Sequence, residues 1–447
     1  MNNKIKLAVA GAVLSAASVA NAGIVIPAGD WTLDVNGNVN AFATWVNADK
    51  PSAGGVASGG LAIAEDSTGE SNAQGINTGL LPAWLGFTGT TRQNDVDVSF
   101  TISFQPNVSD NFSHGDAKTP LNRQAFVTFG DKSWGTVKLG KDLGIFAGQA
   151  ILNDMTLLGV GGGVNMTSGG ATSLGGIGTG YIYPAWKGQV AYTTPNMNGF
   201  TATIAITNPN QGSFGDGVDN TTTTTSLSSN GSGTSSVSSN AATELYQDRF
   251  GIEGQVMYEW AGDVSGKVWA SGASYDVNSG LSTTEGTADT SATDDSYTAT
   301  AFDIGAHITS GNFGLTGYYY DGDGVGSTIF GRNGVYNNGS EFKKRDSDGG
   351  YLQATYVIPT GTKIGVAYGV SNLDKASGET GLTAISTTNA TSAYLLDKNE
   401  RWTVGAYHPL TKHLNLVAEW NRVESEAHKA NTKLESDSFS LGAILFF

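Results

Sequence analysis

The chain ends on SDSFSLGAILFF (residues 436–447), in which apolar side chains recur at every second position. Counted back from the end, the members of this series are Phe447, Leu445, Ala443, Leu441 and Phe439. Alternate side chains of a β-strand point to opposite faces, so the pattern predicts a strand with one apolar face and one small or polar face. Chain ends are usually loose and solvated, so a terminal phenylalanine indicates that something apolar covers it.

The same alternation of apolar and polar residues recurs in the segments that begin at Trp31, Asp95 and Phe250. Period two is the signal of a half-buried strand. On the polar faces of the second and third segments lie Asp97, Glu253 and Glu259. Runs of helical period are hard to find, and the 62 glycines of the chain disfavour helices.

Turn spacing predicts how the strands are connected. Short turns rich in Gly, Pro, Asn and Asp are expected at 92–95, 130–133, 195–199, 261–265, 309–312, 359–362 and 409–412. Long polar stretches alternate with them, at 47–79, 106–121, 142–188, 208–247, 277–299, 321–348, 371–398 and 424–436. Fifteen connections imply sixteen strands, and this separation of turn lengths is typical of outer-membrane barrels. We therefore predict an all-β, 16-stranded antiparallel transmembrane β-barrel with long external loops and short periplasmic turns, closed by pairing of its first and last strands.

The amino-terminal residues have the pattern of a secretory signal peptide. Lys4 and Lys6 precede an apolar run of small residues, and Ala20-Asn21-Ala22 has the form of a cleavage site. A membrane anchor is the weaker alternative because the run is short and rich in Ala, Gly and Ser. We expect residues 1–22 to be the signal peptide and residues 23–447 to form a single barrel domain.

Composition excludes several classes of protein. The chain has no cysteine, so disulfides do not hold it together. It carries 24 basic and 40 acidic side chains, a formal charge of −16, which argues against nucleic acid as a partner. Beyond the leader there is no apolar stretch of about 18 residues, so a membrane location requires a closed barrel.

The segment RQAFVTFGDKSWGTVKLGK (residues 123–141) resembles a hairpin of the Gram-negative general porins, which are trimeric sixteen-stranded barrels. Further pieces that resemble this family are AWLGFTG (83–89), YTTPNMNGF (192–200), RDSDGGYLQATY (345–356), YGVSNLD (368–374) and YHPLTKHLNLVAEW (407–420). The pieces are spread over most of the chain and keep the family's order.

The resemblance implies a water-filled channel narrowed by an inward-folded third loop, here about residues 142–175, that faces basic side chains on the wall. Asp154 falls where the family keeps an acidic loop residue, and Arg123 falls on a basic-wall position. Lys141 replaces the usual arginine, which keeps the charge but loses the rigid fork of donors. Trp84 stands where many members have another arginine, and Leu158 stands near the usual loop glutamate. The expected constriction is therefore less polar than usual.

These observations predict an outer-membrane porin for passive diffusion of small hydrophilic solutes and ions. The acids of the fifth long loop, which enrich cations over about 8 Å, predict a mild cation selectivity; they are Asp276, Glu285, Asp289, Asp294 and Asp295. The expected partners are the outer-membrane bilayer, its lipopolysaccharide and two further copies of the chain, because the family is trimeric. We expect no cofactor and no metal.

An outer-membrane enzyme and a surface adhesin are the alternatives. An enzyme needs a nucleophile and a base held together by an orienting group. The five histidines are His114, His307, His408, His413 and His428, and none belongs to an evident catalytic constellation. His307 and Asp303 have the parity of lumen-facing residues, which a structural pair explains without catalysis. Solute flux into liposomes separates a channel from an adhesin, and esterase or protease assays separate it from an enzyme.

Overall fold

The computed structural model describes residues 23–51, 57–65, 69–106, 108, 121–163, 172–208, 245–246, 249–279, 296–331, 333–337, 342–379, 394–428 and 432–447. The proposed signal peptide and most of the fifth long loop lie outside the described residues. So does His114.

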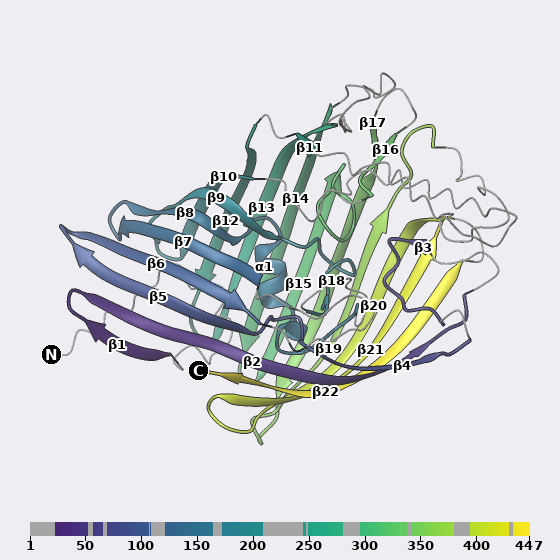
Figure 1. Ribbon diagram of the computed structural model, residues 1–447, viewed down its shortest axis with the longest axis horizontal. Helices are drawn as coiled ribbons and strands as arrows, with labels where there is room; N and C mark the ends of the chain where they lie inside the picture. The colour runs from purple at the N-terminus through teal and green to yellow at the C-terminus, as the bar shows by residue number, and fades with distance from the viewer. Residues whose placement is uncertain are drawn as a thin grey trace, which may run out of the picture.

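Sixteen strands of the described chain close into one antiparallel barrel (Figure 1). In order around the barrel they are β2 (Trp31–Ala48), β5 (Trp84–Gln93), β6 (Val96–Gln105), β7 (Leu121–Asp131), β8 (Gly135–Leu143), β9 (Trp186–Thr193), β10 (Phe200–Thr207), β12 (Gly251–Trp260), β13 (Val264–Ser279), β14 (Ser296–Ser310), β15 (Phe313–Asp323), β18 (Asp346–Val357), β19 (Lys363–Leu373), β20 (Tyr394–Pro409), β21 (Leu414–Ala427) and β22 (Lys433–Phe446). The predicted strand number and fold class are confirmed.

The barrel closes where the sequence predicts. β22 pairs with β2 from Phe446 opposite Asn38 to Ser436 opposite Ala48. Phe447 continues the pairing, because its N–H and C=O each bond to the backbone of Gly37. The apolar series of the final segment faces outward, and the Phe439 ring stacks on Trp45 across the junction with centroids 6.2 Å apart. Closure leaves no free edge between the first and last barrel strands.

All seven short turns lie at one end of the barrel, which we call the short-turn rim, and the eight long connections join strand ends at the other, the long-loop rim. Both sets fall within a few residues of the predicted positions. Side chains alternate outward and inward along each strand. On β14, for example, Phe302 and Ile304 are more than half exposed outward, whereas Ala301 and Asp303 are buried inside.

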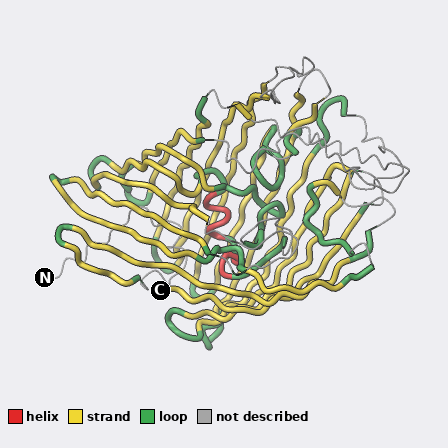
Figure 2. The backbone as a smooth tube through the Cα atoms, in the orientation of Figure 1, coloured by secondary structure: helices red, strands yellow, loops and turns green. Residues whose placement is uncertain are grey.

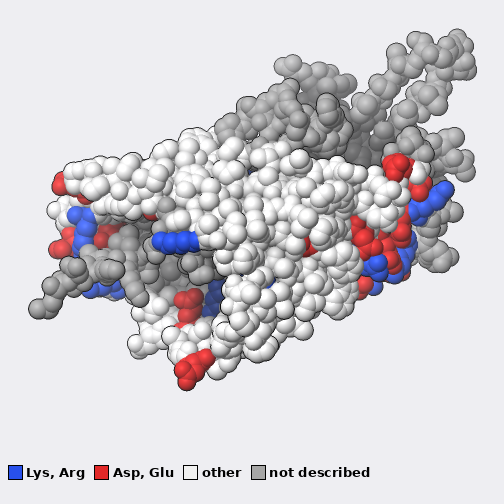
Figure 3. Space-filling view, turned by 90° about the horizontal axis from the view of Figure 1, so that it is seen from below, with Lys and Arg blue, Asp and Glu red and all other residues white. Residues whose placement is uncertain are grey.

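Most of the barrel surface seen in Figure 3 carries no charge, and lysine, arginine, aspartate and glutamate lie mainly toward its two ends. The exposed large apolar side chains come from the outward positions of nearly every barrel strand. An outward apolar band between two charged ends is what a lipid bilayer requires of a barrel.

The remaining elements are short. They are β1 (Ile24–Ala28), β3 (Ala57–Ser58), β4 (Asn72–Asn77), β11 (Leu245–Tyr246), β16 (Val335–Asn337), β17 (Phe342–Lys344), the helix α1 (Gly148–Asn153) and the 3-10 helix η1 (Met155–Leu158). β1 forms a hairpin with the start of β2 at the short-turn rim, which the sequence analysis did not predict. In the described part of the chain, no helix has the length and apolarity needed to cross a membrane.

A buried ion pair fastens two long connections together at the long-loop rim. Arg345, just before β18, donates from Nε and Nη2 to the two oxygens of Glu379 at 3.0 and 2.7 Å, and from Nη1 to the Asn333 carbonyl. Burial by itself raises the pKa of Glu379, but the guanidinium and the Ala376 N–H bond its charged form and hold the pKa below the ordinary value.

We expect acid to break the ion pair between Arg345 and Glu379. A carboxylate whose folded pKa is depressed stabilises the fold above its unfolded pKa, about 4.3, and that contribution is lost as the pH falls through the folded value. Hydrogen exchange of Arg345 and Ala376, corrected for intrinsic rate, should therefore accelerate below about pH 4. Glu379→Gln should show the faster exchange already at neutral pH. Equal protection of wild type and variant at pH 7 would contradict the role given to the charge.

Candidate functional site

The third long connection, residues 144–185, is here called loop 3. Its described parts, residues 144–163 and 172–185, fold into the barrel (Figure 2, where the helical turns are red). Leu157, Ile151 and Ala150 are buried with interior side chains of the wall in one apolar cluster. Asp154 ends α1 and caps η1, because its Oδ1 accepts from the Thr156 N–H at 2.9 Å. The predicted inward fold of the third loop is confirmed.

Three carboxylates on the interior wall hold loop 3 by its backbone. Glu253 of β12 accepts from the N–H groups of Ile145 and Phe146 at 2.6 and 3.2 Å. Asp303 of β14 accepts from Ala147 at 3.0 Å. Glu419 of β21 accepts from Val160 and Gly161, both at 2.8 Å. Charged acceptors form strong bonds to backbone amides, so these carboxylates set the path of the loop.

The first anchor is part of a buried charge pair. Lys187 of β9 donates to Glu253 Oε1 at 2.6 Å, and the same oxygen accepts from the Tyr275 hydroxyl. The side chains of Lys187 and Glu253 are 4% and 0% exposed, so neither charge has water as an alternative partner. A buried ion pair of this kind is tolerated because each charge compensates the desolvation of the other.

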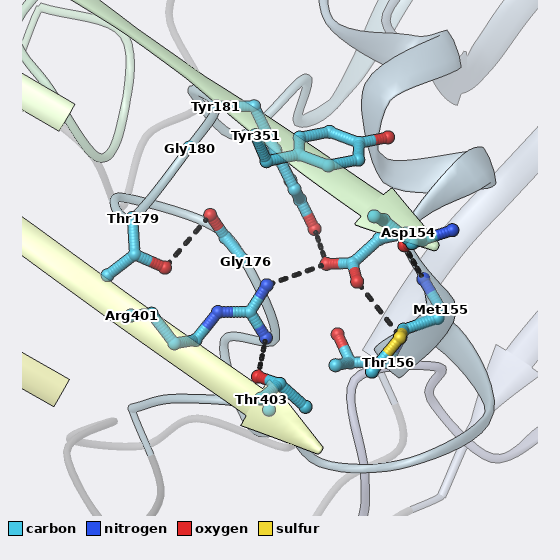
Figure 4. A network of polar contacts seen from close by, with 12 residues as sticks. Asp154, Met155, Thr156, Gly176, Thr179, Gly180, Tyr181, Tyr351, Arg401 and Thr403 are labelled. Atoms are coloured by element: carbon cyan, nitrogen blue, oxygen red, sulfur yellow. Dashed lines mark hydrogen bonds and ion pairs between the residues drawn. The ribbon is translucent and has the colours of Figure 1, made fainter. Parts of the chain in front are cut away.

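Asp154 of loop 3 is the centre of a second buried network of polar contacts, which includes Arg401 of the barrel wall (Figure 4). Its Oδ2 accepts from the Tyr181 hydroxyl at 2.8 Å and lies 3.6 Å from Nη2 of Arg401 on β20. Arg401 in turn donates to Thr403 at 3.0 Å. The network joins the outgoing and returning arms of loop 3 to one wall of the barrel.

On the same wall, the backbone of loop 3 lies directly against a barrel strand. A side chain on Gly369 of β19 would meet the Thr179 carbonyl at 2.1 Å, so only glycine permits the returning arm to lie there. Gln353 of β18 accepts from the Met155 N–H at 2.6 Å, and Tyr351 donates to the Ala150 carbonyl at 2.8 Å. From β12 to β21 the wall is therefore covered by loop 3.

The opposite wall, from β5 to β8, keeps a polar lining with partial exposure. Its inward residues include Thr88, Thr101, Gln124 and Lys138, none of which is fully buried. Lys138 pairs with Asp142 four residues later, and Gln124 donates to the same carboxylate at 3.0 Å. These side chains are the polar groups that line the interior opposite loop 3.

The structure does not bring Arg123 and Lys141 together with Asp154. Lys141 lies on the outward face of β8 with Leu139, and its Nζ donates to the Asn122 carbonyl at 3.1 Å. Arg123 lies at a bulge of β7, with its guanidinium 6.0 Å from the Trp186 ring. Their chain neighbours Gln124 and Asp142 face inward, and the part of Arg123 and Lys141 in a constriction remains a prediction.

Trp84 and Leu158 take apolar positions in the interior. Trp84 is 8% exposed, donates from Nε1 to Asn36 at 3.3 Å and packs edge-on against Phe446. Leu158 ends η1 and packs against the apolar clusters of the interior. Both fit the expected loss of polarity around loop 3, and their part in a constriction remains a prediction.

The five lumen-facing candidates all have inward parity, but they occupy two different environments. Glu253 and Asp303 are buried anchors of loop 3. Asp97 and Glu259 lie near the short-turn rim, where Asp97 pairs with Arg92 at 2.8 Å. His307 is partly buried and its Nδ1 lies 2.8 Å from the Thr316 hydroxyl.

Sequence reasoning missed Arg401, Glu419 and Lys187 as partners of loop 3. A signal for Arg401 was present, because the apolar residues Trp402 and Val404 are the outward positions of β20 and leave Arg401 facing inward. Which loop atom it meets depends on the path of loop 3 and has no local signal. Among the described residues, no group of three or more His, Cys, Asp or Glu side chains is arranged to hold a metal ion.

Comparisons with known proteins agree with this architecture. A family model described as Gram-negative porin matches residues 7–428. No curated protein sequence matches significantly. The solved outer membrane channel DcaP of Acinetobacter baumannii is 15% identical with a TM-score of 0.62, covering 95% of this chain and 100% of that one. Salmonella typhi OmpF, in complex with daunomycin, is 15% identical with a TM-score of 0.55, at 95% and 100% coverage.

A third solved structure is the trimer form of OmpT, an outer membrane protein of Vibrio cholerae. It is 15% identical with a TM-score of 0.51, covering 93% of this chain and 99% of that one. At these identities the structures support the fold, and the family rests on the match over residues 7–428. The chain therefore belongs to the Gram-negative porin family and is a multi-pass β-barrel of the outer membrane.

Proposed function

We propose that this porin forms a water-filled channel for passive diffusion of small hydrophilic solutes and ions, and that it works as a homotrimer. The observation that carries the proposal is the asymmetry of the interior. Loop 3 is sealed against the wall from β12 to β21, while the wall from β5 to β8 keeps a polar, partly exposed lining. A sixteen-stranded barrel is wide enough for an aqueous lumen, and a loop fixed to one side narrows it without filling it.

The homotrimer is supported by the trimer form of the similar Vibrio cholerae protein. Homo-oligomers usually have closed symmetry. The outward apolar band fits a bilayer, and the charged side chains at the long-loop rim fit the lipopolysaccharide headgroups there. We place the short turns in the periplasm.

Liposome swelling tests the channel itself. Proteoliposomes should swell in isotonic solutions of small sugars, at rates that fall as the sugar grows. Swelling separates a channel from an adhesin or a closed barrel enzyme, since neither passes solute. Impermeable liposomes that contain correctly folded, heat-modifiable barrel would overturn the proposal.

We further propose a mild preference for cations, which the overall acidity of the chain supports. Two lysines three residues apart on β8 offer a matched test. Lys138→Gln removes an inward cation and leaves Asp142 unneutralised, so the reversal potential in a salt gradient should shift toward stronger cation preference. Lys141→Gln removes an outward cation and should leave the reversal potential unchanged. A larger shift from Lys141→Gln would contradict the assignment of faces.

A further inference from the structure

One buried carboxylate oxygen at the short-turn rim has no partner. Asp34 lies on β2 and faces inward, as Asn38 and Asn40 do further along the strand. Its Oδ1 is shielded from solvent and accepts no hydrogen bond. A buried acceptor without a donor destabilises the folded state, and native structures contain few of them.

The backbone of Gly23 lies close to that oxygen. β1 pairs with β2 so that Val25 is opposite Asp34, and Gly23 lies two residues earlier, on the same face. A Cβ on Gly23 would lie 2.0 Å from Asp34 Oδ1 and 3.0 Å from Oδ2. The Gly23 nitrogen is one covalent bond from the same Cα. No lysine or arginine among the described residues forms an ion pair with Asp34.

Gly23 is also the residue that the sequence predicts to become the amino terminus. Hydrolysis of the Ala22–Gly23 peptide bond by a signal peptidase uses one water, leaves a carboxylate on Ala22 and frees the amine of Gly23, which takes up a proton. One amide N–H is thereby replaced by a positively charged group with three donors, next to a carboxylate that lacks one.

We propose that Asp34 is the receptor for the processed amino terminus, and that cleavage after Ala22 creates an ion pair between the Gly23 ammonium and the Asp34 carboxylate. The pair fastens β1 to β2 beside the junction of β2 and β22, where Phe447 ends. In the unprocessed chain Gly23 has no free amine. The ion pair can therefore form only after the signal peptide has been removed during export. The inference is independent of whether the barrel conducts.

The test uses mature protein purified from outer membranes. Mass spectrometry should find Gly23 at the amino terminus. Reductive methylation with ¹³C-formaldehyde then labels the α-amine, and its NMR titration should give a pKa above the ordinary range of about 7.7–8.0. Asp34→Asn should return the pKa to that range. The matched control Asp30→Asn removes an exposed acid in the hairpin turn and should leave the raised value in place.

Stability gives a second readout. A raised α-amine pKa stabilises the fold fully below the unfolded value and loses that contribution as the pH rises through the folded value. The difference in urea midpoint between wild type and Asp34→Asn should therefore shrink as the pH is raised through and above the measured pKa. A different amino-terminal residue, an ordinary pKa in the wild type, or a pKa unmoved by Asp34→Asn would each overturn the proposal.

Discussion

Replacing Glu253 with alanine is expected to lower the free energy of unfolding by about 3–5 kcal/mol, because it leaves the Lys187 ammonium buried without its counter-charge. The same change removes the acceptor of the Ile145 and Phe146 N–H groups, so the start of loop 3 loses its anchor. Urea unfolding of the refolded barrel in detergent measures the first effect. Single-channel recordings should show the second as added current noise.

The matched control for Glu253→Ala is the double variant Lys187→Met with Glu253→Gln. Removing both charges avoids the unpaired ion, so most of the lost stability should return. Glutamine also keeps an acceptor for the loop amides. If the single and double variants were equally destabilised, the loss would come from packing and not from the uncompensated charge.

Replacing Asp154 with alanine is expected to be the second most damaging change, also lowering the free energy of unfolding by about 3–5 kcal/mol, since the buried Arg401 would lose its ion-pair partner. Three contacts are lost together: the ion pair, the Tyr181 hydrogen bond and the cap on η1. Loop 3 is then free to move from the wall, and conductance should rise with frequent transitions between levels.

Tyr181→Phe is the matched control for Asp154→Ala. It removes one hydrogen bond to the same carboxylate and keeps the charge, so the loss should be about 0.5–1.5 kcal/mol with near-normal conductance. An Asp154→Ala channel with wild-type conductance and stability would show that this network does not position the loop.

The strand number and the closure of the barrel could be predicted because their signals are local. Turn residues mark each short connection, and the alternation in residues 436–447 identifies the outward face of the last strand. β1 was missed because its sequence, IVIPA, is short and does not alternate. It is a strand only because β2 extends beyond Phe447 and offers an edge.

The faces of Arg123 and Lys141 could not be predicted from family position, for a physical reason. Side-chain direction reverses at each residue of a strand, so an error of one position moves a residue from the lumen to the lipid. The bulge of β7 near Arg123 adds such a position, and nothing in the local sequence marks it. Family position alone therefore did not fix the face.

The contacts between loop 3 and the barrel wall could not be predicted from the sequence, for a different reason. Glu253, Asp303 and Arg401 each lie inward by the alternation of their own strands, which the sequence shows. Their contacts with Ile145, Ala147 and Asp154 depend on how one long connection crosses the barrel. Such pairings between distant segments are set by tertiary packing and carry no local pattern.

The most direct test of the channel is the single-channel conductance of the purified mature protein in a planar lipid bilayer, under a salt gradient. We predict stepwise currents that appear and close in groups of three, with a reversal potential that favours cations. A bilayer that stays silent after insertion of folded, heat-modifiable protein would contradict it.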